Sequence, residues 1–535
     1  MKERHFRIIF IILVAGLLIS AIYIYVFKQS EKTLLASKLN FNKKESLISN
    51  NIRIGIIDFD NINPILSNNK NVQDISRLIF DPLYTLTEDY KIEGVLAKEW
   101  SKIADKTYII KLNENILWHD GNKFDSSDVI FTINMLENLK ENSIYYHNIK
   151  NIAQVNQIDE YTIKIITDRD IQHFEYNLIF PIISSKYFNE ENLNLTSKNT
   201  KPVGTGMFYI SEVNNKSILL KKNLENSKVQ DLKIETISLK LYSSLSTVIE
   251  AFKTEEIDIF TTSNKGVEEY LKNTRYNINR YINREYNYLA LNCNSKILSN
   301  KEVRQAISYA INKEYILKNV LYDKYEISNS LLDFGSFAYD ISNDIIAYDT
   351  NNAKNILVEN YWKYSAEGWR KKVNNRNLKI KLDIVVNKNN IDNVKVANNI
   401  KEQLSLVGIL INIKEVNEKE YNNILKNKSY DMIIVNDTYS YSPSLEKYFG
   451  EGNLSNYTNE EINRLLKEVE FLSNENEVKQ KYTTINQIYI EQVPYISLYY
   501  DTSAIIYSPN LKGTITPNSY NLFYGIENWY REYEK

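Results

Sequence analysis

The sequence predicts an α/β fold, because strand-like and helix-like apolar patterns alternate along most of the chain. Ile52–Phe59 is an apolar run that fits a buried first strand. A later helix face ends at Gly408, the residue type expected just after a helix, and is formed by Val396, Ile400, Leu404 and Val407. Ile409–Ile413 then resumes as a strand, and Tyr430–Val435 has the continuous apolar pattern of a central strand.

A strand, a tight turn and a helix start follow one another in the first third of the chain. Thr107–Leu112 places apolar side chains on one face at period two, as a half-buried strand does. Asp120-Gly121 is a turn dipeptide. Asp125 is expected to cap the next helix, with Asp128 three positions on, and the apolar face of that helix is formed by Val129, Ile133 and Leu136.

A second amphipathic helix is expected near residue 300. Ser299 and Glu302 have the spacing of a capping box. The apolar face that follows consists of Val303, Ala306, Ile307, Ala310 and Ile311.

The N-terminus has the pattern of a membrane anchor. Ile8–Phe27 is an unbroken apolar run of about 20 residues, the length that crosses a hydrocarbon core as a helix. Basic residues precede it and would hold that end in the cytoplasm, and no small-residue cleavage site follows. We therefore predict an uncut anchor in residues 1–27, with a membrane span at 8–27, and a polar tether over residues 28–50; cleavage and release is the alternative.

Composition excludes several classes of protein. The 535 residues are 43% hydrophobic, enough for two or three domains with cores of their own. The formal net charge is −2 without long runs of one sign, so nucleic acid is not an expected partner. Cys293 is the only cysteine, which rules out an intramolecular disulfide and a cysteine zinc cluster. The 41 tyrosines reflect either codon bias or rings that contact a ligand.

The sequence contains no pattern that predicts catalysis. Gly-x-Ser-x-Gly is absent, and Gly204-Thr205-Gly206 lacks the Lys-Ser/Thr of a phosphate loop, so we interpret it as a turn that enters a strand. The four histidines do not have the spacing of a metal motif, although His119 and His147 are candidate contacts to a metal chelate. We expect neither enzymatic activity nor a cofactor.

The segment Leu117–Thr132 resembles the Trp-x-Asp-Gly…Ala/Ser-x-Asp-Val-x-x-Thr motif of the extracellular solute-binding proteins of family 5, the oligopeptide, dipeptide and nickel type that serve ABC importers. Further stretches match that family in order: Asn63-Pro64 with Asp81–Leu83, Gly204–Phe208, Glu255–Ile259, Val303–Asn312 and Val407–Ile409.

This resemblance implies a two-lobed, periplasmic-binding-protein-like fold of the class II type. Lobe one would contain residues 51–88, 200–284 and 500–535, and residues 89–199 would form an inserted subdomain. Lobe two would contain residues 285–499, with a return crossing through Pro494–Tyr500. The boundaries follow the family, because pattern alone does not place them.

The resemblance also implies a function outside the cytoplasm. The chain would capture a peptide between its lobes by hinge closure and deliver it to ABC permease subunits as a membrane-anchored monomer. Two alternatives stay open, namely a non-peptide solute such as a metal chelate and a signal-peptide sensor that feeds no transporter.

The family's ligand-contacting segments map onto strand ends of this chain. The implied ligand-binding residues are Asn68, Lys70, Thr261, Thr262, Tyr286, Asn287, Asn436, Asp437, Thr438, Ser440, Tyr441, Tyr499 and Tyr500. Ser440 stands where peptide-binding relatives have the Asp that pairs with the ligand's amino group. A neutral serine weakens capture of a buried ammonium, so we hypothesise that Asp437 supplies the counter-charge instead.

Overall fold

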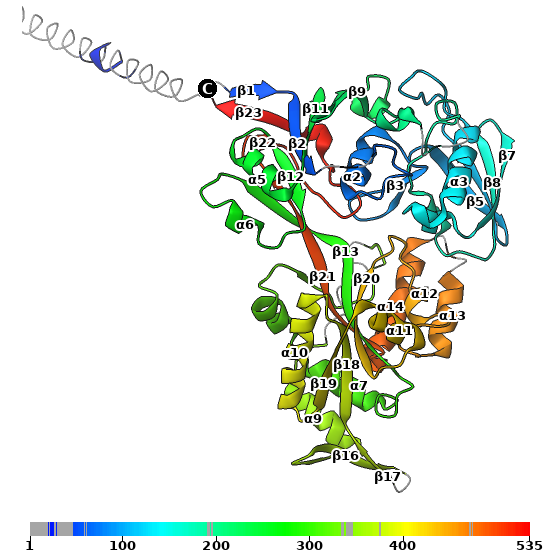
Figure 1. The fold of residues 1–535 in the computed structure, drawn as a ribbon, viewed down its shortest axis with the longest axis vertical. Coiled ribbons are helices and arrows are strands. Elements are labelled where there is room, and N and C mark those ends of the chain that lie inside the picture. Colours follow the sequence, from blue (N-terminus) through cyan, green and yellow to red (C-terminus); the bar gives the residue numbers. More distant parts are fainter. Residues whose placement is uncertain are drawn as a thin grey trace, which may run out of the picture.

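A computed structural model describes residues 46–534, apart from 58, 60, 190–192, 194–195, 333–335, 339–345, 374–375, 470–471 and 473, together with residues 20, 22–25 and 28. Figure 1 shows an upper and a lower lobe joined by two long strands, β13 (Asn277–Leu291) and β21 (Tyr495–Tyr507). These strands pair antiparallel and belong to one eleven-stranded sheet, which therefore continues through both lobes.

The upper part of this sheet follows the order β21-β12-β2-β11-β10-β9. Its strands are β2 (Asn51–Ile57), β9 (Phe208–Asn214), β10 (Ser217–Lys222), β11 (Thr236–Tyr242) and β12 (Ile259–Thr262). The helices of this lobe are α2 (Lys70–Ile79), α5 (Leu245–Lys253) and α6 (Val267–Tyr270). β2 pairs parallel with both β11 and β12, so it is an internal strand of the sheet. In the apolar run predicted for it, Ile52, Ile54 and Ile56 are buried, whereas Ile57 is 37% exposed.

The lower part of the sheet follows the order β19-β18-β20-β13-β21, and β14 (Glu326–Ile327) also pairs with β21. Its other strands are β18 (Lys381–Asn387), β19 (Leu410–Val416) and β20 (Met432–Thr438). The larger helices of this lobe are α7 (Lys301–Ala310), α9 (Thr350–Glu359), α10 (Ile391–Leu406), α11 (Glu418–Asn427), α13 (Glu460–Val469) and α14 (Glu475–Gln492). Shorter pieces are α8 (Lys313–Tyr315), α12 (Glu446–Phe449), β15 (Lys363–Ser365), β16 (Gly368–Val373) and β17 (Arg376–Lys379). The predicted central strand is β20, which lies between β18 and β13.

Alternation along β13 divides the lower core into two layers. Leu289 and Leu291 belong to the cluster beneath α7 and α10, whereas Tyr288 and Ala290 belong to the cluster that contains α13 and α14. Successive side chains of a strand point to opposite faces, so this one strand connects both layers.

A separate four-stranded sheet lies beside the upper lobe, in the order β5-β6-β8-β7. Its elements are β5 (Ala97–Ala104), β6 (Thr107–Leu112), β7 (Ile152–Asp159), β8 (Thr162–Thr167), α3 (Ser126–Leu139) and α4 (Tyr146–Ile149), and the hairpin β3 (Tyr84–Leu86) and β4 (Ile92–Gly94) precedes them. We call residues 89–199 the insert. The domain boundaries given above stay predictions.

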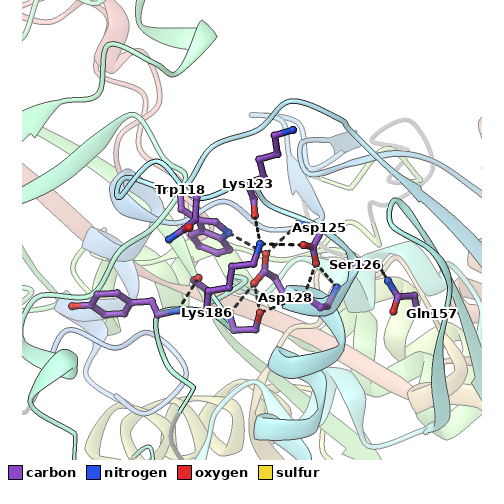
Figure 2. Close-up of polar contacts among 12 residues, drawn as sticks. Trp118, Lys123, Asp125, Ser126, Asp128, Gln157 and Lys186 are labelled. Atoms are coloured by element: carbon purple, nitrogen blue, oxygen red, sulfur yellow. Dashed lines mark hydrogen bonds and ion pairs between the residues drawn. The ribbon is translucent and has the colours of Figure 1, made fainter.

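Figure 2 shows how the strand–turn–helix motif is held together in the insert. Asp125 caps α3 in the predicted capping box with Asp128. The buried Asp128 carboxylate accepts hydrogen bonds from Trp118 Nε1 (3.0 Å), the Asp125 amide (3.2 Å), and the amide and hydroxyl of Ser185 (2.8 and 2.7 Å). Burial raises the pKa of Asp128, and these hydrogen bonds oppose that rise. The motif therefore has a structural role, because it joins α3 to the loop that contains Ser185.

The predicted strand-entry turn packs directly against α2. A Cβ added to Gly204 would lie 1.8 Å from the carbonyl oxygen of Ile79, and one added to Gly206 would lie 2.7 Å from the Ile79 carbonyl carbon. His119 fastens the same turn, because its Nδ1 accepts from the Gly204 amide (3.1 Å) and its Nε2 lies 3.1 Å from the Gly206 carbonyl oxygen. Backbone approach this close leaves no room for a side chain.

The outer edge of the upper lobe brings distant parts of the chain together. β1 (Ser46–Ser49) pairs with β23 (Tyr530–Glu534), which also pairs with β22 (Leu511–Lys512). The predicted tether thus includes residues that form a strand. The predicted membrane span, residues 8–27, lies mostly outside the described residues, and no helix within them is long and apolar enough to cross a bilayer.

One predicted helix start is wrong. The N-cap of α7 is Asn300 and makes no side-chain capping bond, while the Ser299 hydroxyl donates to the Lys296 carbonyl. The Glu302 carboxylate pairs with Lys371 and accepts from Trp362 Nε1, so it is drawn away from the helix start by tertiary contacts. The apolar face predicted for this helix is buried.

Asp128→Ala is expected to lower the midpoint of thermal unfolding by about 4–8 °C, because four donors lose their buried acceptor. Calorimetry of the purified protein measures the shift. Asp105→Ala, at the exposed turn between β5 and β6 of the insert, is the matched control and should leave the midpoint unchanged. Equal midpoints for the two variants would contradict the structural role of Asp128.

Candidate ligand-binding site

A cavity of about 460 Å³ lies between the lobes, beside the strands that join them. We call it the central cavity. Its walls come from α2, the insert, β13, the segment after β20, and the C-terminal segment. The side chains that matter below are Lys70, Asp74, Arg77, His147, Arg284, Glu285, Thr438, Ser440, Tyr441 and Tyr520. A volume of this size is typical of pockets for small ligands.

An interruption in strand pairing opens this wall of the cavity. The register of β13 against β21 shifts between Ile282 and Tyr286, so Asn283–Glu285 leave the regular ladder. All three of these residues line the cavity. At this irregularity, polar side chains of β13 therefore face the space between the lobes.

Two guanidinium groups supply positive charge. Arg77 lies over the ring of Tyr520, 3.5 Å from its centroid, and Arg284 lies 4.2 Å from the centroid of Tyr441. Arg284 Nε also donates to the Tyr439 carbonyl (2.7 Å), whereas the described residues offer Arg77 no carboxylate within ion-pair distance. Asp74, one turn before Arg77, pairs with Lys70. Among the described residues, Arg77 therefore has no carboxylate in direct contact at the cavity wall.

Glu285 supplies negative charge at the same wall. Its carboxylate accepts a hydrogen bond from the Thr438 hydroxyl (3.3 Å), and burial raises its pKa. His147 also lines the cavity, and burial lowers its pKa, which favours the neutral imidazole. The cavity thus presents charged groups of both signs.

Four of the residues predicted from sequence meet at this cavity, namely Lys70, Thr438, Ser440 and Tyr441. Asn68 lies beside it and holds the loop that leads to His147. The Asn68 side chain donates to the Asn142 carbonyl (3.3 Å) and accepts from the Ile144 amide (3.2 Å).

Five other predicted residues belong to the lower lobe and do not line the cavity; four of them are buried, and Asn436 is exposed. The hydroxyls of Tyr286 and Ser497 are 2.6 Å apart, and Tyr500 donates to the Leu332 carbonyl (3.0 Å). Tyr499, Asn287 and Asn436 form one polar network around Asn393 and Asn287 Oδ1. Their hydrogen-bonding groups are therefore engaged within the protein.

The remaining predicted residues lie apart from the central cavity lining. Thr261 and Thr262 are in β12 and pair with Ile505 and Ala504. Asp437 forms an ion pair with Lys447, and its Oδ1 accepts from the Thr438 amide (2.8 Å). The carboxylate that we predicted to hold an ammonium is thus already paired.

Tyr441 links the two lobes across the cavity. Its ring stacks on Tyr90 with centroids 5.8 Å apart, and its hydroxyl donates to the Ser519 carbonyl (2.9 Å). A second link joins the insert to the lower lobe, where Gln172 donates to the Leu466 carbonyl (2.7 Å) and accepts from Ser444 (3.1 Å).

Sequence reasoning missed Arg77, Arg284 and Glu285. A signal for Arg77 was present, because Lys70, Asp74 and Arg77 recur at helical spacing on one face of α2. Arg284 and Glu285 directly precede the predicted pair Tyr286-Asn287, but no pattern in the sequence marks the register shift that exposes them.

The profile of the bacterial extracellular solute-binding proteins, family 5, middle region, matches residues 91–455. The chain belongs to this family. This solute-binding protein is 25% identical over 307 residues to the glutathione-binding protein GsiB of Salmonella paratyphi A, a match that covers 56% of this chain and only 59% of GsiB. It is 22% identical over 496 residues to the oligopeptide-binding protein AppA of Bacillus subtilis, covering 88% of this chain and 89% of AppA.

A crystal structure of a putative peptide-binding protein AppA from Clostridium difficile matches 90% of the solute-binding protein and 100% of that chain, with 25% identity and a TM-score of 0.70. The two-lobed α/β fold predicted from sequence is confirmed by these comparisons and by the structure.

Tyr441→Ala is expected to increase the radius of gyration of the ligand-free protein, because it removes a stacking contact and a hydrogen bond between the lobes. Small-angle X-ray scattering measures the change. Tyr270→Ala, at an exposed tyrosine of α6, should leave the radius unchanged. If the two variants scatter alike, Tyr441 does not hold the lobes together.

Proposed function

We propose that this solute-binding protein captures short peptides in the central cavity and delivers them to the permease of an ABC importer. The family, the oligopeptide-binding relative that matches along most of the chain, and the inter-lobe position of the cavity support this proposal. A ligand that contacts both lobes favours the closed state by its differential affinity, which is the requirement for capture by hinge motion.

The observation that carries the proposal is that one cavity contains both a positively charged and a negatively charged side chain. Arg77, which has no carboxylate partner among the described residues, suits a ligand carboxylate. Glu285, on the opposite strand wall, suits a ligand ammonium. A short peptide carries both groups at its two ends, and its backbone can bond to the hydroxyls of Thr438, Ser440 and Tyr441.

The wider arrangement belongs to the same proposal. The protein acts as a non-enzymatic monomer of the class II type, outside the cytoplasm, held to the membrane through residues 8–27 and working with ABC permease subunits. The attachment of β1 to the upper lobe supports this, because an anchor before Ser46 would leave the lower lobe free to close.

Mass spectrometry of ligand that purifies with the native protein tests the proposal directly. A series of short peptides is the expected result. A bound metal chelate, or a single compound without peptide bonds, would contradict it.

Arg77→Gln is expected to weaken binding of a tripeptide by about 10-fold or more, because the carboxylate loses a charge-assisted hydrogen bond in a partly desolvated site. Titration calorimetry with the tripeptide and its C-terminal amide measures this. The amide should bind both proteins equally. Equal losses for the two ligands would show that Arg77 does not recognise the carboxylate.

Glu285→Gln is expected to remove most of the preference for a free over an N-acetylated tripeptide, whereas Asp437→Ala should preserve it, because Asp437 is paired with Lys447. The preference should fall as the pH drops through the raised pKa of Glu285, since protonation removes its charge. Loss of the preference only in Asp437→Ala would restore our original hypothesis about that residue.

A further inference from the structure

We propose that a second pocket, between the insert and the lower lobe, binds a cationic group of the ligand, such as the side chain of a lysine or an arginine. The pocket has a volume of about 640 Å³. Its assignment to a peptide side chain rests on the proposed function, whereas its preference for a cation rests on the chemistry of its walls.

Aromatic rings form much of this pocket. Trp100, Tyr108, Phe174 and Tyr176 come from the insert, and Phe337 comes from the lower lobe. Tyr108 and Phe174 stack with centroids 4.2 Å apart, which fixes that wall. Ring faces attract a cation through their quadrupoles, so such walls favour an ammonium or guanidinium group.

His173 and Glu175 provide the polar end of the pocket. Their side chains are only 9% and 12% exposed, and His173 Nδ1 lies 3.8 Å from Glu175 Oε1. His173 Nε2 and Glu175 Oε2 are buried and have no hydrogen-bond partner among the described residues. His173 also has a φ of 50°, in the left-handed region, which is a strained conformation for a histidine.

His173 Nε2 and Glu175 Oε2 both need a hydrogen-bond donor. With the His173 proton on Nδ1, facing Glu175, Nε2 carries a lone pair and accepts a hydrogen bond. Glu175 Oε2 is also an acceptor. A buried acceptor without a donor is costly, so a bound ammonium or guanidinium would satisfy both atoms together.

The charged side chains around the pocket also favour a bound cation. Lys102, a cation at the wall, is 2.9 Å from Asp170 and is neutralised by it. Glu475, in the first turn of α14, adds a carboxylate at the exposed rim from the opposite lobe. Closure of the lobes would therefore bring two carboxylates to one cation.

The pocket adjoins the central cavity. Tyr176 lines both, and its hydroxyl donates to the Tyr90 carbonyl (3.0 Å), so its ring forms a fixed wall between them. A long basic side chain of a peptide held in the central cavity can pass beside this ring. A free organic amine is the other source of the same chemistry.

The test compares Ala-Lys-Ala with Ala-norleucine-Ala by calorimetry on the full-length chain. The wild type is expected to bind the lysine peptide about 10-fold tighter, as a desolvated charge pair gives. In Glu175→Gln the two affinities should become nearly equal, with the norleucine peptide unaffected. Glu475→Gln, at the exposed rim, should reduce the ratio of the two affinities by a smaller factor. Because Glu475 is exposed, this variant still tests the pocket if the buried Glu175→Gln variant misfolds.

The matched control is Glu477→Gln, an exposed carboxylate in the same helical turn that does not line the pocket. It should leave the ratio unchanged. Agmatine, a free amine with a guanidinium group, is titrated separately, and the change in tryptophan fluorescence is measured. The contribution of Trp100 is the difference between the wild type and Trp100→Phe. An agmatine response that Glu175→Gln abolishes, with equal tripeptide affinities, supports the pocket and identifies a free amine as its ligand.

Equal affinities for the two tripeptides together with no agmatine response overturn the inference and leave peptide capture intact. If no tripeptide binds but agmatine does, the proposed function fails and the pocket stands. If neither binds, both are overturned.

Discussion

The pairing of β13 with β21 is the constraint on which the rest of the structure depends. These two strands connect the lobes and carry one sheet through both of them. Their ladder is interrupted between Ile282 and Tyr286, and a second register shift follows between Asn287 and Tyr288. A fully regular ladder would join the lobes more stiffly and would direct Arg284 and Glu285 into the strand pattern. The irregularity therefore provides a place to bend and a set of polar groups at one position.

Tyrosine is used in two ways on either side of this position. Below the cavity, Tyr286, Tyr439 and Tyr500 pack with centroids 4.6 to 5.6 Å apart, and burial raises the pKa of Tyr286 and Tyr439 well above its usual value. Above it, Tyr441 and Tyr520 form the surfaces on which arginines stack. The lower group of tyrosines therefore builds a core, whereas the upper group lines a cavity.

The elements that could be predicted from sequence are those fixed by local interactions. The β6 strand, the Asp125–Asp128 capping box and the end of α10 before Gly408 depend on neighbours within a few residues, and each is present. The Ser299–Glu302 box failed because Trp362 and Lys371, distant in sequence, take the Glu302 carboxylate. The site was predicted less well for the same reason. The resemblance to the family implies that Tyr441 and Ser440 contact a ligand, and this stays a prediction. The Lys447 partner of Asp437 and the register shift beside Glu285 arise only in the folded chain.

The pairing of β1 with β23 has a mechanical consequence. They lie side by side on the upper lobe, so both the segment that leads in from the N-terminus and the segment that leads out to the C-terminus reach the same half of the molecule. A force applied through either segment would be transmitted to the upper lobe and would bypass the crossing strands. The angle between the two lobes would therefore be independent of any load on these segments.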